Sequence, residues 1–179
     1  MSMNLIGGSI LNYCYNNLIS HFPSHFVRKS FLRAFNKNIH STAVILMHSK
    51  LLNFWKIEIG ESVVINQNCV LDCRRYKIII DNNTDIGPYT RIWTLGHKPD
   101  SETHELYGGD VNISHHVWIA SGVTILPGVN IGKGAVIAAS SVVHKNVQEL
   151  DIVAGNPASF IRKRKNSLTY TLKFNPILE

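Results

Sequence analysis

An aliphatic residue recurs at every sixth position through much of this chain. The longest unbroken run is Ile113, Ile119, Ile125, Ile131, Ile137 and Val143. Two shorter runs with the same spacing are Ile80, Ile86 and Ile92 and, before them, Ile59, Ile65 and Leu71. A period of six matches neither the 3.6-residue period of a helix nor the dense alternation of an ordinary strand. The pattern therefore predicts an internal repeat of short units.

Each six-residue unit suits a short strand followed by a corner. The aliphatic side chain would point inward, and a small residue four places later would fit beneath the corner, as at Val117, Val123, Val129, Ala135, Ser141 and Val147. Glycine follows the aliphatic residue at Gly60, Gly87 and Gly132, where we expect it to take strained backbone dihedrals. Three units close a triangular coil, and coils stack through backbone hydrogen bonds about 4.8 Å apart.

The spacing assigns the coils and one extrusion. Two coils cover residues 113–148, one covers residues 80–97, and one with three extra residues covers residues 59–79. The distance from Ile92 to Ile113 is 21 residues, which leaves residues 98–112 outside the coils as an extruded loop. Long loops on rigid scaffolds commonly carry function.

The run of Ile/Val-Gly units resembles the hexapeptide repeat of left-handed parallel β-helix proteins, and the left hand is implied by that resemblance. We therefore expect an all-β chain of three parts: an N-terminal helical cap (residues 1–40), a left-handed β-helix (41–161) and a basic C-terminal tail (162–179). In the cap, Pro23 to Phe35 is predicted to be an amphipathic helix, with Arg28, Lys29 and Arg33 opposite its apolar face of Phe26, Val27, Phe31, Leu32 and Phe35. A second helix over residues 4–19 would use Leu5, Ile6, Ile10, Leu11, Tyr15 and Leu18 to pack on the first coil, on a partner subunit or on a membrane face.

Composition and charge limit the function classes. The chain has 179 residues, 45% of them apolar, which predicts a globular domain with a core. The net charge of +6 is concentrated at the ends, and residues 1–57 contain no acid. A basic segment with apolar faces suggests contact with a membrane surface. Nucleic-acid binding is disfavoured because no basic motif interleaved with aromatic residues is found.

We expect the chain in the cytoplasm, where its basic N-terminal segment would contact the inner face of the membrane. No apolar run is long enough for a membrane span, and no charged n-region of a signal peptide is seen. The three cysteines are an odd number, so a disulfide framework is not expected.

Further motifs lie within residues 57–164. They are Trp93-Thr94-Leu95-Gly96-His97, Val117-Trp118-Ile119-Ala120-Ser121-Gly122, Ile125-Leu126-Pro127-Gly128-Val129, Ser140-Ser141-Val142-Val143-His144-Lys145 and Ala154-Gly155-Asn156-Pro157-Ala158. In this order the sequence resembles the acyl-CoA-dependent O-acetyltransferases of the hexapeptide family, closest to the branch that modifies sugars of lipopolysaccharide, capsule or colanic acid. The resemblance implies a homotrimer with active sites between neighbouring prisms, acetyl-CoA as co-substrate and a sugar hydroxyl as acceptor.

The resemblance also implies roles for two catalytic candidates. His97 would be the general base, because a near-neutral imidazole suits removal of a hydroxyl proton. Ser121 matches the position that approaches the thioester and would stabilise the oxyanion. His104 is a lesser candidate near the acceptor. A covalent cysteine route is set aside because Cys69 is at an inward position and Cys14 shows no base beside it, while the role of Cys73 stays open.

Binding residues follow from the same resemblance. Trp118 would wall the acyl-CoA groove or pack in the trimer, and Ala120, Ala138 and Ala139 would let backbone groups approach CoA. Lys145 and Arg162 would meet the CoA phosphates. Asn156 and Pro157 would begin the turn across the last coil, and Pro157 with Ala158 would lie beside the adenine. The candidate acceptor residues are Asp72, Glu105 and Tyr107, with Asp100 and Glu102 as further loop candidates.

Alternatives remain at this point. A zinc hydratase on the same scaffold would need three histidine ligands. His97, His115 and His116 are the only attractive set, but adjacent His115 and His116 should diverge, so no metal is expected. A non-catalytic scaffold is disfavoured because the catalytic and CoA positions are all occupied. Among acetyltransferases, the acceptor stays open between a sugar, a lipid-linked glycan, an amino sugar, serine and an antibiotic.

Overall fold

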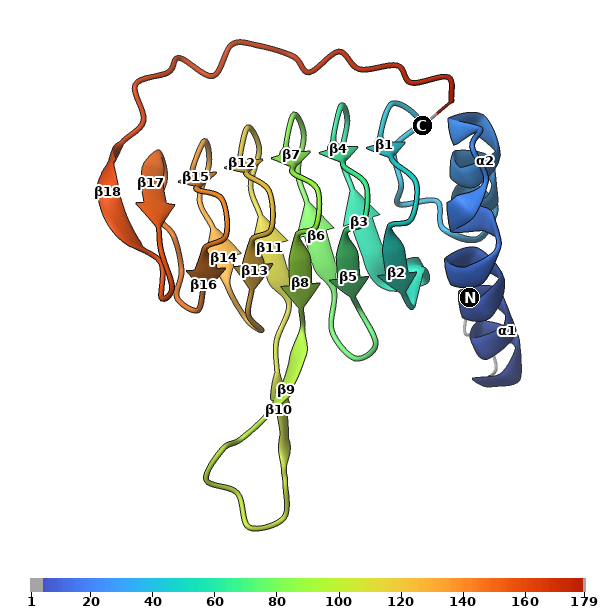
Figure 1. Ribbon diagram of the computed structural model, residues 1–179, viewed down its shortest axis with the longest axis horizontal. Coiled ribbons are helices and arrows are strands. Elements are labelled where there is room, and N and C mark those ends of the chain that lie inside the picture. The colour runs from blue at the N-terminus through green and yellow to red at the C-terminus, as the bar shows by residue number, and fades with distance from the viewer. Residues whose placement is uncertain (1–4, 179) are drawn as a thin grey trace.

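The computed structural model describes residues 5–178, and its main body is a parallel β-helix with three faces (Figure 1). The chain visits the faces in turn, so each coil contributes one short strand to each sheet. The four-stranded face contains β3 (Ile57–Ile59), β6 (Ile78–Ile80), β11 (Val111–Ile113) and β14 (Asn130–Ile131). The five-stranded face contains β2 (Lys50–Leu52), β5 (Val70–Asp72), β8 (Arg91–Trp93), β13 (Thr124–Ile125) and β16 (Val142–Val143). The seven-stranded face contains β1 (Val44–Ile45), β4 (Val64–Ile65), β7 (Asp85–Ile86), β12 (Trp118–Ile119), β15 (Val136–Ile137), β17 (Asp151–Ala154) and the antiparallel β18 (Ser159–Lys163).

The aliphatic positions of the repeat all point into the core, and none is more than 2% exposed. They stack in three columns: Ile59, Ile80, Ile113 and Ile131; Ile65, Ile86, Ile119 and Ile137; Leu71, Ile92, Ile125 and Val143. The small residues four places later are buried as well. Removing these continuous apolar columns from water is the main source of stability in the stack. The register confirms the predicted repeat.

The glycines of the repeat serve close packing and do not have strained dihedrals. Gly87 has no positive φ, but a Cβ there would lie 2.7 Å from backbone atoms of Ala120 and Ser121 in the next coil. The backbone of the next coil also crowds Gly60 and Gly132. Positive φ occurs instead three places after the inward residue, at Ser62, Asn68, Asn83, Tyr89, His116, Gly122, Gly128, Gly134 and Ser140. The predicted role of these glycines is therefore wrong, because at Gly60, Gly87 and Gly132 the neighbouring coil lies too close for a Cβ.

One coil precedes those that the repeat predicts. Ile39 is bridged to Ile59, β1 pairs with β4, and β2 pairs with β5. Ile39, Ile45 and Leu51 are six residues apart, and each is at most 1% exposed. The period thus extends to this coil, but the 3₁₀ helix η2 (Phe54–Lys56) shifts the register before Ile59.

Two helices, α1 (Leu5–Asn17) and α2 (His25–Phe35), cover the first coil (Figure 1), and the 3₁₀ helix η1 (Ile19–His21) joins them. The helices occupy the predicted places, but Phe26 is 74% exposed and Arg28, predicted on the solvent face, is completely buried. The Arg28 guanidinium donates to the carbonyl oxygens of Phe22, Pro23 and Ile45. Buried carbonyl groups need donors, and a guanidinium supplies several from one side chain.

The outward surface of α1 is apolar. Tyr15 is fully buried and Leu11 packs partly on the core, but Ile6 and Ile10 are more than half exposed, as is Leu18 directly after the helix. Residue 4 and the side chain of Leu5, which belong to the predicted helix, lie outside the described part. Within residues 5–178, no helix has both the length and the apolar character that a membrane crossing needs.

After β18, residues 164–178 return along the prism as an extended strap (Figure 1). Arg164 donates to the carbonyl oxygens of His116 and Gly134 at 2.9 and 3.1 Å. Leu172 packs against an apolar cluster of Val44, Leu46 and Val64. Leu178 is bridged to Ser24 beside α2, so the strap connects the two ends of the stack.

Candidate active site

The extruded segment is an antiparallel hairpin, which we call the arm (Leu95–Gly108). Its strands are β9 (Leu95–His97) and β10 (Leu106–Gly108), and the arm projects on the side opposite the strap (Figure 1). The extrusion is as predicted, but it starts before residue 98, and it ends earlier because Val111 and Asn112 already pair in β11. The coil resumes before the aliphatic Ile113, so the count of residues alone could not locate this end.

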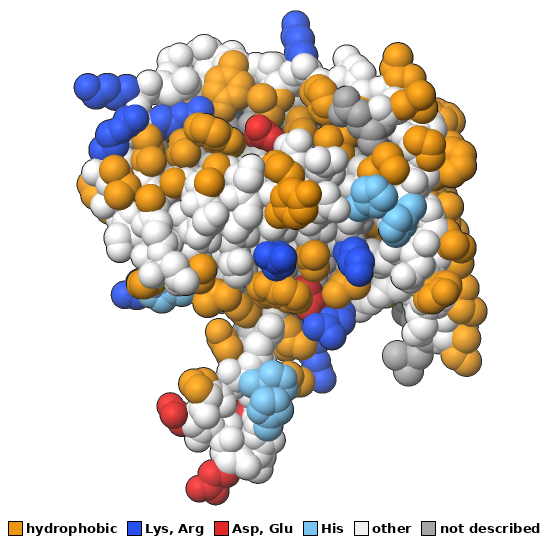
Figure 2. All heavy atoms as spheres, in the orientation of Figure 1, with side chains coloured by type: hydrophobic (Ala, Val, Ile, Leu, Met, Phe, Trp, Pro, Cys, Tyr) orange, Lys and Arg blue, Asp and Glu red, His pale blue; other side chains and the backbone are white. Residues whose placement is uncertain are grey.

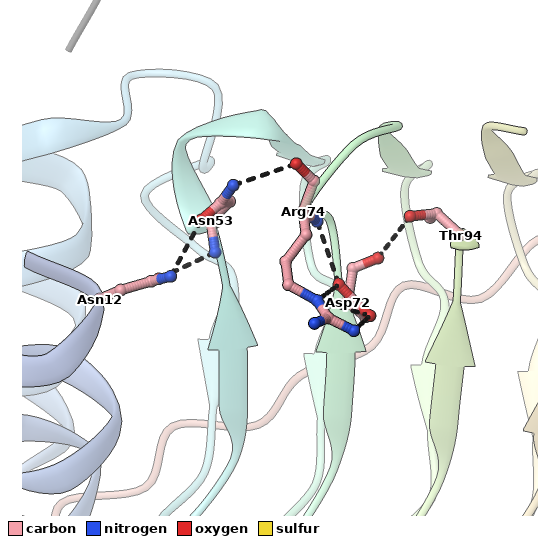
Figure 3. Close-up of polar contacts among 5 residues, drawn as sticks. All are labelled: Asn12, Asn53, Asp72, Arg74 and Thr94. Carbon is pink, nitrogen blue, oxygen red and sulfur yellow. Dashed lines mark hydrogen bonds and ion pairs between the residues drawn. The ribbon is translucent and has the colours of Figure 1, made fainter. Parts of the chain in front are cut away.

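Buried contacts fix the root of the arm. Thr94, directly before β9, is fully buried, and its hydroxyl donates to the carbonyl oxygen of Asp72 at 2.6 Å (Figure 3). Gly109 N donates to the Thr94 carbonyl oxygen at 3.1 Å. A Cβ on Gly108 would overlap that oxygen and the ring of Tyr76. The root therefore requires glycine at position 108 and holds the direction in which the arm leaves β8.

A chain of polar contacts connects this root to the helical cap (Figure 3). Both carboxylate oxygens of Asp72 accept hydrogen bonds from the Arg74 side chain, at 2.8 to 3.1 Å. The Arg74 carbonyl oxygen accepts a hydrogen bond from Asn53 Nδ2 at 3.2 Å. Asn53 exchanges two hydrogen bonds with Asn12 of α1, at 2.8 and 2.9 Å. The cap and the arm thus share one supporting network.

His97 is exposed on the arm, and its ring orientation is defined by two contacts. Its Nδ1 lies 2.9 Å from the backbone carbonyl oxygen of His104. Because a carbonyl oxygen only accepts, Nδ1 carries a proton and, in the neutral ring, the lone pair is on Nε2. The two histidine rings stack with centroids 3.6 Å apart and an interplanar angle of 13°. A neutral imidazole in this tautomer can accept a proton at Nε2.

Most of the predicted CoA-contacting residues lie along one edge of the prism, between the seven-stranded and five-stranded faces. Ala120 N donates to the Ile137 carbonyl oxygen at 2.9 Å, so Ala120 and Ala138 stack directly after β12 and β15. Ser121 and Ala139 follow them and are exposed. We call Ala120, Ser121, Ala138 and Ala139 the alanine corner. Its small side chains leave the backbone of stacked coils open to approach.

The next turn extends this edge. Val142 N donates to the Gly155 carbonyl oxygen and Ala158 N donates to the Val142 carbonyl oxygen, each at 2.9 Å. These bonds hold Asn156 and Pro157, both exposed, beside the end of the alanine corner.

A row across the seven-stranded face adds Trp118 and Arg162. The register places Trp118 opposite Val136, Val136 opposite Ile152, and Ile152 opposite Arg162. Trp118 is 48% exposed and Arg162 is exposed. The two side chains therefore lie in one row across the outer surface, next to the alanine corner.

His97 and the alanine corner lie at opposite edges of the five-stranded face. Ser121 precedes Thr124, which pairs with Arg91 at the start of β8. His97 is six residues beyond Arg91, about 20 Å along an extended chain. Lys145 follows β16 and therefore lies on the arm side of this face. The structure does not bring His97 and Ser121 together within one chain.

The predicted acceptor residues differ in accessibility. The Asp72 side chain is completely buried and paired with Arg74, so no carboxylate oxygen faces solvent. Glu105 and Tyr107 are exposed on the arm, where Glu105 forms an ion pair with Lys98 at 2.9 Å and the Tyr107 ring packs on Gly96. Asp100 and Glu102 are exposed at the tip of the arm. Figure 2 shows basic side chains gathered where the arm joins the prism and acidic ones at its tip.

The cysteines are poorly placed for nucleophilic chemistry. Cys69 and Cys73 are fully buried, and burial raises the pKa of each thiol to about 12. Cys69 Sγ donates to the Gly87 carbonyl oxygen at 3.3 Å, which adds to its structural role. A thiol with such a pKa supplies little thiolate near neutral pH.

The adjacent His115 and His116 side chains contact each other. The expectation that His115 and His116 diverge is wrong, because their Nδ1 atoms lie 2.9 Å apart, with His116 at a φ of 59°. His116 Nε2 donates to the carbonyl oxygen of Tyr170 in the strap at 2.8 Å. Among residues 5–178, no three histidine, cysteine or acidic side chains form a group that could hold a metal ion.

Comparison with known proteins relates the chain to acetyltransferases. It is 55% identical over 113 residues to a Lysinibacillus sphaericus protein described as a probable macrolide acetyltransferase, covering 59% of this chain and 62% of that one. A hexapeptide-repeat-containing acetyltransferase from Vibrio cholerae, complexed with acetyl coenzyme A, is similar with a TM-score of 0.78 and 27% identity over 89% of this chain and 86% of its own. A galactoside acetyltransferase in complex with coenzyme A is similar with a TM-score of 0.80 and 27% identity over 97% and 87%.

These similarities cover the repeat and confirm the predicted left-handed β-helix fold with its N-terminal helix. No family model matches the sequence. The chain spans about three fifths of the length of the curated relatives it matches. The similarity to hexapeptide-repeat acetyltransferases is general and does not single out the branch that modifies lipopolysaccharide or capsule.

Proposed function

We propose that this chain is an acetyl-CoA-dependent O-acetyltransferase in which His97 is the general base. The observation that carries the proposal is the hydrogen bond from His97 Nδ1 to the His104 carbonyl oxygen, because it leaves Nε2 as the proton acceptor. The complexes of similar proteins with acetyl-CoA and CoA support the choice of donor.

The reaction is direct transfer in a ternary complex. Nε2 of His97 takes the proton of the acceptor hydroxyl as its oxygen attacks the thioester carbonyl. The resulting oxyanion is stabilised by the Ser121 hydroxyl or a nearby backbone amide. When the tetrahedral intermediate collapses, the carbon–sulfur bond breaks, and the CoA thiolate takes the proton from the His97 imidazolium. The acetyl ester and CoA leave, and His97 is again neutral.

The site is assembled between subunits of a homotrimer. His97 and the alanine corner lie at opposite edges of the five-stranded face, so one chain cannot bring them to the same thioester. A neighbouring prism turned about a three-fold axis would present its alanine corner to the arm. In this arrangement Trp118 walls the CoA groove, and Ala120, Ala138 and Ala139 contact CoA through their backbone.

The remaining proposed CoA contacts are with its phosphates and its adenine ring. Lys145 and Arg162 meet the CoA phosphates, which suits their exposed cationic side chains. Asn156 and Pro157, in the turn after β17, lie beside the adenine.

The proposed acceptor is a sugar or glycan hydroxyl, such as one of an envelope polysaccharide precursor. Similarity to a galactoside acetyltransferase and to a maltose O-acetyltransferase from Clostridium difficile supports a sugar. Glu105 and Tyr107 on the arm are the proposed acceptor contacts, since carboxylates and aromatic rings suit sugar hydroxyls and ring faces. A role for Asp72 in direct contact would require Arg74 to move away.

An antibiotic acceptor is the second candidate. The relative with 55% identity is described as a probable macrolide acetyltransferase, which favours a macrolide hydroxyl over serine or an amino sugar.

The experiment that tests the proposal measures thiol release from acetyl-CoA with a panel of acceptors. The panel contains galactosides, maltose, lipid-linked glycans, amino sugars, serine and a macrolide. Release with a sugar, and its loss in H97N, supports the proposal. Release with the macrolide alone supports the second candidate, and no release above the rate without acceptor contradicts both.

We also propose that the helical cap contacts the inner face of the membrane, which fits a cytoplasmic enzyme acting on lipid-linked precursors. Exposed Ile6, Ile10 and Phe26 would insert at the surface, and the acid-free segment would favour anionic lipid. Sedimentation with anionic vesicles tests this proposal. Binding should weaken in I6S/I10S/F26S, and equal binding of this variant would contradict it.

A further inference from the structure

His104 is the residue most closely associated with His97, and the proposed reaction gives it no role. Its φ is 54°, in the left-handed region that bulky residues rarely adopt. In this conformation the backbone carbonyl oxygen reaches His97 Nδ1 at 2.9 Å while the imidazole stacks on the His97 ring at 3.6 Å. One residue therefore contacts His97 through its backbone and its side chain together.

We propose that His104 is a positioning residue for His97. The inference rests on the proposed function, in which Nε2 of His97 accepts the proton of the acceptor. The carbonyl oxygen fixes the tautomer, and the stacked ring fixes the plane of the imidazole. An exposed histidine held by one hydrogen bond could still rotate about that bond, and the stack removes this freedom.

The turn that carries His104 is closed by its own contacts. His104 N donates to the Ser101 carbonyl oxygen at 3.2 Å, and Glu105 N donates to Ser101 Oγ at 2.9 Å. Lys98 N donates to the Glu105 carbonyl oxygen at 2.8 Å, and their side chains form an ion pair at 2.9 Å. The turn thus presents the His104 ring without support from the prism.

The kinetic test compares H104N with H104F. Asparagine tolerates positive φ, so H104N keeps the backbone and loses the stack. We expect H104N to lower kcat about 10- to 100-fold, with an unchanged KM for acetyl-CoA, because a loosely held base is misplaced in the transition state. H104F retains a flat ring and should keep kcat within a fewfold of the wild type. The matched control is H48N, since His48 has a φ of 61° and lies away from the arm.

A spectroscopic test needs no substrate and therefore separates this inference from the proposed function. Nitrogen-15 NMR of the full-length protein should show His97 as the Nδ1–H tautomer in the wild type and in H104N, which keeps the backbone carbonyl in place. H104P cannot adopt the φ of 54° that directs this carbonyl oxygen to Nδ1, so it should show a mixture of tautomers. Wild-type His97 as the Nε2–H tautomer would overturn the inference, as would an unchanged kcat in H104N. If thiol release is absent with every acceptor but the tautomer changes as expected, the proposed function fails while the positioning role stands.

Discussion

Asp72 accepts hydrogen bonds from Arg74 through both carboxylate oxygens, and the carboxylate is completely buried while the Arg74 side chain is 56% exposed. Because of this asymmetry, removing Arg74 would leave an unpaired charge in the interior, whereas removing the charge of Asp72 would leave one that reaches solvent. The backbone carbonyl of Asp72 also accepts the Thr94 hydroxyl at the root of the arm. The pair therefore belongs to the support of the arm.

We expect R74A to destabilise the protein more than D72N. R74A leaves a buried carboxylate with the backbone N–H of residue 74 but without its charged partner, which costs about 3 kcal/mol, whereas D72N leaves a guanidinium that can reach water and costs about 1 kcal/mol. Urea unfolding at pH 7 measures both free energies of unfolding. If D72N instead raises only the KM of the acceptor and leaves stability unchanged, Asp72 contacts the acceptor directly.

Removing the His97 imidazole should abolish most of the turnover. We expect H97A to lower kcat by a factor of about 10²–10⁴, the usual contribution of a general base. Binding of acetyl-CoA, measured by calorimetry, should be unchanged because the proposed CoA contacts come from the alanine corner, Lys145 and Arg162 and not from the imidazole. The control is H40N, since His40 is exposed far from the arm, beside the cap. A normal rate in H97A would remove His97 from the mechanism.

A site shared between subunits predicts that two inactive variants complement each other. H97A removes the base, and A139W blocks the alanine corner with a bulky side chain at an exposed position. After random mixing of subunits, roughly a quarter of the interfaces combine an intact arm with an intact corner, so about a quarter of the wild-type rate should return. The mixture is assayed after co-refolding, with each variant alone as the control. No recovery in a verified mixed oligomer would place both groups in one subunit.

How far the sequence predicts this structure depends on the kind of interaction. Columns such as Ile65, Ile86 and Ile119 follow from the period because each coil must bury the same position. The burial of Arg28 does not follow, because its acceptors are backbone carbonyl groups that no sequence pattern displays. The positive φ positions are likewise hidden, since residues as different as Tyr89 and Gly128 share them.

The candidate site likewise has features that the sequence predicts and features that it does not. The motifs around His97 and Ser121 mark positions of chemistry, but their placement at opposite edges depends on which corner each motif occupies. The stack of His97 on His104 arises from a turn closed by Ser101, a contact seven residues apart that periodicity cannot indicate. The pairing of Asp72 with Arg74 is local. Its only signal in the sequence was the three extra residues of the coil at residues 59–79, which follow β5.

Thiol reactivity tests the absence of a covalent route. Burial raises the pKa of Cys69 and Cys73 to about 12, while Cys14 is partly exposed. We therefore expect native protein at pH 8 to release at most one equivalent of thionitrobenzoate rapidly, and C14S to release none. Unfolding in guanidinium should expose all the remaining thiols in each protein. Rapid acetylation of Cys69 or Cys73 by acetyl-CoA in native C14S would contradict direct transfer.

His25 should make stability depend on pH through the helical cap. Burial, with added repulsion from Lys29 and Arg28, lowers the pKa of His25 to about 4, and its Nε2 accepts a hydrogen bond from Ile45 N at 3.4 Å. Between pH 6.5 and 4 the unfolded chain binds a proton that the folded chain does not, so stability falls as the pH falls through this window. Allowing for solvent screening, the loss is about 1–2 kcal/mol. H25Q keeps an acceptor for Ile45 N but does not titrate. The difference in melting temperature between the wild type and H25Q should therefore change between pH 7 and pH 4. A constant difference would show that the fold does not lower the pKa of His25.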